Sequence, residues 1–147
     1  MDLKSKAFEH GGKIPSLYTC DGRDVSPPLE IKDVPKGTAA LALVMDDPDA
    51  PMGTFDHWVV WNIPPDTMEI AEGKEPKGVH GRTGFGRLAY GGPCPPSGTH
   101  RYQFKLYALD QELKLAQGAS KGQLEAVMKG HILAQALLEG KYQRVRR

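Results

Sequence analysis

Glycine and proline constrain the fold of this chain most strongly, because together they interrupt it along its whole length. The 147 residues include 17 glycines and 12 prolines. Proline cannot donate to a hydrogen-bond ladder and glycine destabilises helix interiors, so both favour short elements joined by turns. The sequence therefore predicts a mainly β fold.

Three apolar runs bounded by turn residues have the length and composition of β-strands. They cover residues 39–45, 57–63 and 101–109, and weaker candidates cover residues 4–8 and 29–32. Residues two apart in a strand lie on the same face. In two of the predicted strands, one face begins with a histidine and continues with apolar or aromatic residues. These faces hold His57 with Val59, Trp61 and Ile63, and His100 with Tyr102, Phe104 and Leu106.

One stretch near the end of the chain has the pattern of a helix. Ser120 is a candidate N-cap and Gln123 occupies the third position of a capping box. Gly140 suits the end of this helix, although Gly130 inside it costs ~1 kcal/mol relative to alanine. The apolar face is then formed by Leu124, Val127, Met128, His131 and Leu138.

The overall composition is that of one ordinary globular domain, which we expect to span residues 1–147. Hydrophobic residues make up 39% of the chain, and 19 basic residues balance 18 acidic ones. This balance provides no positive field for nucleic acid. We expect no transmembrane segment, since no run approaches the ~20 apolar residues that a spanning helix needs. Residues 1–10 lack the apolar core of a secretory signal, so the predicted location is cytoplasmic.

The chain contains two cysteines, Cys20 and Cys94. They could pair, but a reducing compartment favours free thiols. Neither cysteine belongs to a C-x-x-C motif. The sequence therefore predicts two free thiols.

Two motifs, at residues 46–51 and 92–102, concentrate residue types suited to chemistry, and His57 lies between them. Without further support, the first motif is a rigid turn formed by prolines and aspartates. The alternative is that side chains at strand ends converge on one pocket, where imidazole, phenol and backbone N–H groups bind a phosphate or carboxylate. In that pocket a carboxylate would orient a histidine. The residues concerned are Asp47, His57, Cys94, His100 and Tyr102.

The spaced motifs D-P-D-A-P, H-W-V-V-W-N-I-P and G-P-C-P-P-S-G-T-H-R-Y resemble the signature of the phosphatidylethanolamine-binding protein (PEBP) family, also called the Raf kinase inhibitor protein family. The resemblance covers nearly the whole chain and is greatest to the short bacterial and archaeal branch. It implies a β-sandwich of two antiparallel sheets with Greek-key connections, a C-terminal helix and a shallow anion pocket. The pocket residues that it implies are Asp47, His57, Gly92, Pro93, His100 and Tyr102, with Cys94 as part of the wall.

The resemblance also implies a binding or regulatory module, without a cofactor and without enzymatic activity. The expected ligand is a phosphate-like or carboxylate anion, on a small molecule, a phospholipid head group or a phosphorylated peptide. A kinase or a protease is the implied target, and the sequence leaves open whether the chain forms a homodimer. The chain reads Phe55-Asp56-His57 where eukaryotic members have Trp-His-His, so its aromatic wall is smaller.

Three other functions remain open. Cys94 with Asp47, His57 and His100 has the residue types of a cysteine-dependent hydrolase. The same four residues include acceptable zinc ligands, although their spacings lack the tight pairs of recognisable zinc sites. The third open function is protease inhibition through a loop within residues 64–91.

Overall fold

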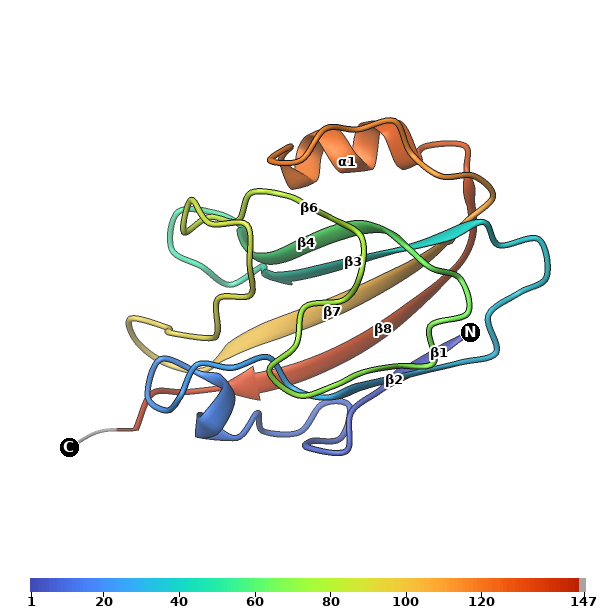
Figure 1. Ribbon diagram of the computed structural model, residues 1–147. Coiled ribbons are helices and arrows are strands. Elements are labelled where there is room, and N and C mark those ends of the chain that lie inside the picture. Colours follow the sequence, from blue (N-terminus) through green and yellow to red (C-terminus); the bar gives the residue numbers. More distant parts are fainter. Residues whose placement is uncertain (146–147) are drawn as a thin grey trace.

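The computed structural model describes residues 1–145 and contains two antiparallel sheets, so the predicted mainly β sandwich is confirmed (Figure 1). The larger sheet has the order β6-β4-β3-β7-β8, and the smaller has the order β1-β2-β5. The larger sheet comprises β3 (Ala40–Asp47), β4 (Phe55–Ile63), β6 (Val79–His80), β7 (His100–Leu109) and β8 (Ile132–Tyr142). The smaller sheet comprises β1 (Asp2–Lys4), β2 (Leu29–Lys32) and β5 (Glu69–Ile70). The helical elements are a 3-10 turn, η1 (Ser16–Tyr18), and α1 (Lys121–Met128).

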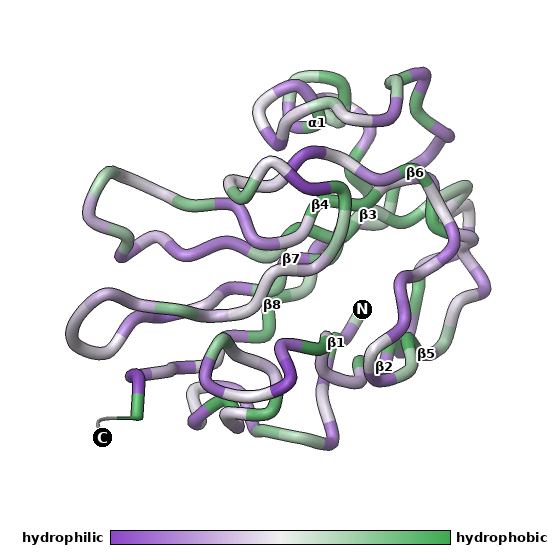
Figure 2. The backbone as a smooth tube through the Cα atoms, turned by 60° about the vertical axis from the view of Figure 1, so that its left-hand side comes forward, coloured by the Kyte–Doolittle hydropathy of each residue, from purple (hydrophilic) through white to green (hydrophobic). Residues whose placement is uncertain are grey.

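The main core lies between the two sheets, because the inward side chains of both are apolar. Leu3 and Ile31 from the smaller sheet pack with Leu43, Trp58 and Phe104 from the larger one. Figure 2 shows the hydrophobic chain of β3 and β4 at the centre of the molecule, with hydrophilic segments in the surrounding loops. Burial of this apolar surface is the main favourable contribution to folding.

A second apolar cluster lies on the opposite face of the larger sheet, beneath α1. Leu124 and Met128 of the helix pack against Val44, Val59 and Trp61 of the sheet. Strands β3 and β4 are therefore apolar on both faces, which explains their continuous runs of hydrophobic residues. Among the described residues, no helix is long and apolar enough to cross a bilayer.

The predicted face of His57 is wrong because of an irregularity in β4. Met45 pairs with Trp58, but the next residue of β3, Asp46, pairs with Asp56, so His57 is the extra residue at this point. Such a bulge interrupts the strict alternation of a strand. Val59 and Trp61 consequently face α1, whereas His57 contacts Tyr102 on the other face of the sheet, with ring centroids 5.3 Å apart.

The predicted helix is correct only in its first half. Ser120 accepts a hydrogen bond from Gln123 N, and the capping box is present, but α1 ends at Met128 and is not C-terminal. Gly130 adopts φ = 85°, a conformation that favours glycine, and β8 follows. Pairing of β8 with β7 over ten positions overrides the helical periodicity, because each pair satisfies backbone groups and turns Leu138 and Tyr142 into the core.

The other strand predictions agree with the structure to within a few residues, except at the N-terminus. Residues 39–45, 57–63 and 101–109 correspond to β3, β4 and β7, and β2 coincides with its predicted range. The candidate at residues 4–8 is displaced, since β1 ends at Lys4. The long stretch from Pro64 to Gly92 is mostly irregular and carries only the two-residue strands β5 and β6.

A glycine in β8 provides a test of how closely this edge of the core is packed. A Cβ atom on Gly140 would lie 2.5 Å from Ile14 Cγ1 and 2.8 Å from Phe8 Cε2. We expect Gly140→Ala to lower the free energy of unfolding by about 1–3 kcal/mol, because both neighbours are buried and must move. Urea denaturation followed by fluorescence measures the change.

Gly122→Ala is the matched control for this substitution. Gly122 lies in α1, and its Cβ would meet only Ser120 Oγ, at 3.8 Å. Alanine there should raise the free energy of unfolding by about 0.5–1 kcal/mol. Equal effects of the two substitutions would contradict the packing around Gly140.

Candidate anion-binding site

A cavity of about 370 Å³ lies at one end of the larger sheet. It forms where β3 ends and where β4 and β7 begin, and these points meet because β3 is antiparallel to both neighbours. We call it the β3–β4–β7 cavity. Its lining residues are Asp47, Ala50, Pro51, Phe55, His57, Phe85, Cys94, Pro95, Pro96, His100 and Tyr102.

Asp47 orients one of the two histidines. Its Oδ2 atom lies 2.7 Å from His100 Nδ1, and both side chains are buried. Its Oδ1 atom accepts a hydrogen bond from Asp49 N at 2.8 Å, which fixes the turn after β3. A carboxylate accepts hydrogen bonds, so Nδ1 of His100 carries the proton and Nε2 is the ring nitrogen available to a ligand.

His57 is oriented by the backbone. Its Nδ1 atom donates to Gly91 O at 2.7 Å, because a carbonyl oxygen can only accept. Burial lowers the pKa of His57 below its usual value, and the Gly91 hydrogen bond and the Asp47 charge oppose this effect only in part. His57 is therefore favoured in its neutral form, with Nε2 as an unprotonated nitrogen.

Tyr102 adds a phenol between the two histidines. Burial raises the pKa of Tyr102, and the nearby Asp47 carboxylate raises it further. The hydroxyl therefore stays protonated and keeps its ability to donate. The His57 ring meets the Tyr102 ring edge to face at 5.3 Å, whereas the His100 ring is stacked at 6.4 Å.

The other carboxylates of the first motif serve different contacts. Asp46 points to the opposite face of β3, where Lys105 Nζ and Lys121 Nζ lie 3.1 Å and 3.2 Å from its Oδ2 atom. Asp49 accepts hydrogen bonds from the backbone and guanidinium of Arg101, which lower the pKa of Asp49 to about 2. Of the three, Asp47 is the carboxylate that lines the cavity.

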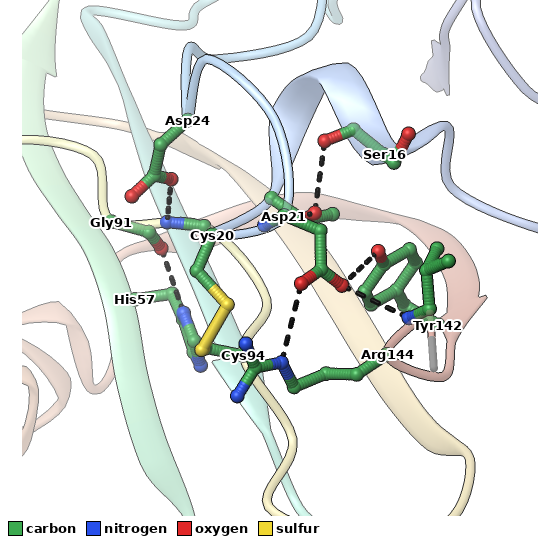
Figure 3. Close-up of a disulfide and its surroundings, with 12 residues drawn as sticks. Ser16, Cys20, Asp21, Asp24, His57, Gly91, Cys94, Tyr142 and Arg144 are labelled. Atoms are coloured by element: carbon green, nitrogen blue, oxygen red, sulfur yellow. Dashed lines mark hydrogen bonds and ion pairs between the residues drawn. A yellow bond between two sulfur atoms is a disulfide. The ribbon is translucent and has the colours of Figure 1, made fainter. Parts of the chain in front are cut away.

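The prediction of two free thiols is wrong in this structure. Cys20 and Cys94 form a disulfide that joins the segment after η1 to the wall of the cavity (Figure 3). Cys20 N also donates to Pro93 O at 3.1 Å, so a backbone hydrogen bond joins the same two segments beside the disulfide. The prediction failed because it relied on the redox state of a compartment, whereas the fold places two distant cysteines together.

Gly92 and Pro93 differ from the expectation, since neither lines the cavity. Gly92 N donates to Asp24 Oδ1 at 2.7 Å, and a Cβ there would lie 2.2 Å from Tyr18 O. The glycine is needed for this close backbone approach, and Pro93 O accepts the bond from Cys20 N. Both residues thus support the loop that carries Cys94.

The prediction from the sequence did not include Phe85, which joins Phe55 in the apolar wall of the β3–β4–β7 cavity. Phe55 and Phe85 both lie against His57, with ring centroids 5.2 Å and 5.3 Å away. Phe85 comes from the irregular loop before Gly91, where a Cβ on either Gly84 or Gly91 would collide with a phenylalanine ring. The sequence did contain a signal for Phe85, which lies between Gly84 and Gly86 in a long irregular loop. Long loops of this kind often have a function.

The zinc alternative finds no support in the geometry. Within residues 1–145, no three histidine, cysteine, aspartate or glutamate side chains are grouped so that they could hold a metal ion. The Cys94 sulfur is bonded to Cys20 and is not available as a ligand in this state.

The two-sheet fold that carries this cavity at one end of its larger sheet is that of a known protein family. The family model described as phosphatidylethanolamine-binding protein matches residues 4–143. The chain therefore belongs to the phosphatidylethanolamine-binding protein family, as the motifs predicted.

The relatives cover the chain almost completely. A UPF0098 protein of Methanothermobacter thermautotrophicus is 51% identical over 150 residues, which cover 98% of this chain and 99% of that protein. The crystal structure of the PEBP homologue CT736 from Chlamydia trachomatis matches with a TM-score of 0.95 and 42% identity, covering 98% of this chain and 97% of that one. Escherichia coli YbcL, described as a member of the mammalian PEBP family, matches with a TM-score of 0.90 and 30% identity, covering 98% of both chains.

Proposed function

We propose that the β3–β4–β7 cavity binds an anionic group, a phosphate ester or a carboxylate, and that the protein acts by binding rather than by catalysis. The observation that carries the proposal is the arrangement of His57 and His100. Each ring is fixed through Nδ1 by a protein acceptor, which leaves Nε2 for a ligand in the same cavity. The Tyr102 hydroxyl is a third donor beside them.

Anion binding in this arrangement requires proton uptake. A neutral imidazole that uses its Nδ1–H elsewhere presents only a lone pair at Nε2, which repels an anion. The protonated ring donates from Nε2 as well and adds a positive charge, giving a stronger, charge-assisted hydrogen bond. The bound anion and the imidazolium thus stabilise each other.

The apolar wall indicates that the anion is part of a larger molecule. Phe55, Phe85 and Pro51 line the cavity beside the histidines, and none of them can hydrogen-bond a bare inorganic ion through its side chain. An organic substituent on the phosphate or carboxylate would bury apolar surface there. Phospholipid head groups and phosphorylated peptides both carry such a group, and occupancy by either is our proposed basis for regulation of a kinase or protease.

The disulfide favours binding over the hydrolase alternative. A cysteine hydrolase needs a free thiolate as its nucleophile. In the structure, the sulfur of Cys94 is bonded to Cys20, so it serves as part of the wall.

Calorimetric titration of sulfate at pH 6 tests the proposed site. We expect His57→Ala and His100→Ala each to weaken sulfate binding by at least about tenfold, because each removes a charge-assisted hydrogen bond that contributes roughly 1.5–3 kcal/mol. His131→Ala is the control, since His131 hydrogen-bonds Asp110 beyond the other end of β7. Unchanged affinity in both cavity variants would reject the proposal.

A further inference from the structure

The two histidines of the β3–β4–β7 cavity are held by acceptors of different charge. His100 Nδ1 meets a carboxylate directly, since Asp47 Oδ2 lies 2.7 Å away. His57 Nδ1 instead donates to a neutral carbonyl, Gly91 O, also at 2.7 Å. A hydrogen bond to a charged acceptor is roughly twice as strong as one to a neutral acceptor. His57, whose pKa burial lowers, therefore has the weaker of the two acceptors.

A second carboxylate reaches His57 through a single peptide group. Asp24 Oδ1 accepts a hydrogen bond from Gly92 N at 2.7 Å. Gly91 C=O and Gly92 N–H belong to the same planar peptide, and resonance couples its nitrogen to its oxygen. Figure 3 shows Asp24 and His57 at the two ends of this arrangement. The groups thus follow the order carboxylate, peptide, imidazole.

This order strengthens the acceptor of His57. Hydrogen bonds in a chain polarise one another, so a carboxylate bound to the peptide N–H makes the oxygen of that peptide a better acceptor. A more negative Gly91 O binds the Nδ1–H of an imidazolium more tightly. The charge of Asp24 has the same effect, because an opposite charge nearby favours the protonated ring.

The ionisable groups around His57 come from several segments. They are Asp24 from the segment after η1, Asp47 from β3, Asp56 from β4, and His100 and Tyr102 from β7. Burial lowers the pKa of His57, and the charges of the three aspartates oppose this effect. Asp47 is already the acceptor of His100, and Asp56 Oδ1 lies 3.0 Å from Lys121 Nζ. Asp24 is the carboxylate whose hydrogen bond leads to His57.

The segment that carries Asp24 is fixed against the loop that carries Gly91. The disulfide joins the two, and Tyr90 OH donates to Tyr18 O at 2.8 Å. Gly91 N also donates to His57 O at 3.0 Å, so the backbone and the ring of His57 bind the same glycine. The ring orientation is therefore set before any ligand arrives, as a precise binding site requires.

We propose that Asp24 is a positioning residue of the anion site, which acts on His57 through the Gly91–Gly92 peptide. This inference rests on the proposed binding of an anion in the β3–β4–β7 cavity. Asp24 fixes the peptide whose carbonyl orients the ring, with Nε2 left for the ligand. Its charge also favours the proton that His57 takes up with the anion. Asp24 is thus the indirect counterpart of Asp47 at His100.

Two substitutions separate the positioning effect from the charge effect. Asp24→Asn keeps an oxygen that can accept from Gly92 N but removes the charge. Asp24→Gly removes the whole side chain. Asp24 adopts φ = 57°, which asparagine and glycine both tolerate, so neither substitution should strain the backbone. Asp33 has the same φ, is exposed and does not line the cavity, so Asp33→Asn and Asp33→Gly are the matched controls.

NMR titration of the histidines without sulfate measures the effect on His57 directly, with His57→Ala to assign its resonances. We expect Asp24→Asn to lower the pKa of His57 by about 0.5–1 unit, because it removes a nearby opposite charge and the polarisation of Gly91 O. Asp24→Gly should lower this pKa at least as much, and its His57 Nδ1 proton should exchange faster with solvent. Both Asp33 variants should leave His57 unchanged.

Calorimetric titration of sulfate from pH 6 to pH 8 tests whether the effect reaches the ligand. If one proton is taken up on binding, a pKa lower by this amount weakens binding about three- to tenfold at a pH above it. Asp24→Asn should show this loss at pH 8, and the difference from the parent protein should narrow as the pH falls and free His57 becomes protonated. A purely structural change would instead weaken binding by the same factor at every pH.

An unchanged pKa of His57 in Asp24→Asn would overturn the inference. So would a loss of sulfate affinity in Asp24→Asn that is the same at pH 6 and pH 8, or an equal loss in Asp33→Asn. If the parent protein binds no sulfate while Asp24→Asn still lowers the pKa of His57, the anion site is rejected and the link between Asp24 and His57 is supported.

Discussion

Loss of the disulfide, by the double substitution Cys20→Ser and Cys94→Ser, is expected to lower the free energy of unfolding by about 4 kcal/mol. The two cysteines are 74 residues apart in the sequence. In the chain-entropy model, a link of this length removes loop-closure entropy from the unfolded chain worth roughly 4 kcal/mol at 25 °C. This is a large share of the ~5–15 kcal/mol by which a domain of this kind is stable.

Denaturation with urea, with and without a reducing agent, measures this effect. The native protein should lose stability on reduction, whereas the double-serine variant should be insensitive to the reductant. Two titratable thiols in the denatured protein before reduction would show that the link is absent and would restore the sequence prediction. Because Cys94 lines the β3–β4–β7 cavity, the same samples also show whether the link supports sulfate binding.

Sulfate is expected to bind up to about a hundredfold more tightly at pH 6 than at pH 8. Sulfate keeps its charge over this range, so the change reports on the protein. Burial lowers the pKa of His57 in the free protein, and binding an anion raises it again. If one proton is taken up on binding, the affinity falls about tenfold for each pH unit above the pKa of the free protein. A hundredfold change corresponds to about 2.7 kcal/mol of stabilisation by a near-saturating anion.

The sulfate-free protein should show the opposite trend. The unfolded chain protonates its histidines near pH ~6.5, whereas folded His57 resists protonation. This contribution to stability is present above that pH and is lost as the pH falls towards the lowered pKa of His57. The stability that sulfate adds is instead largest at low pH and fades as the pH rises through the raised pKa of the bound state.

Thermal denaturation at pH 6 and pH 8, with and without sulfate, separates the two trends. His57→Ala should remove most of the pH dependence in both, because it removes the coupled proton. His131→Ala should leave both unchanged, since His131 pairs with Asp110 instead. Equal sulfate stabilisation at the two pH values in the parent protein would show that no proton is taken up.

Local patterns were sufficient to predict the class of fold and most of the cavity. Glycine and proline marked the turns, and apolar runs between them located β2, β3, β4 and β7. The motifs at residues 46–51 and 92–102, with His57 between them, identified Asp47, His57, His100 and Tyr102, which the structure brings into one cavity. These predictions succeeded because turns and strand ends depend on a few residues that are neighbours in the sequence.

Interactions between distant segments decided the rest. Residues after Gly130 fit a helical period in the sequence, and only their pairing with β7 makes them β8. The bulge that places His57 and Val59 on different faces exists because the register of β3 and β4 shifts by one residue, so that Asp46 pairs with Asp56.

The disulfide and the packing of Phe85 against His57 likewise depend on what the fold places side by side. The sequence by itself therefore determined where β2, β3, β4 and β7 lie and which residues near their ends carry the chemistry. The tertiary structure alone decided which face His57 presents and that the two cysteines meet. The physical reason is that a strand, unlike a helix, completes its hydrogen bonds with residues far away in the chain.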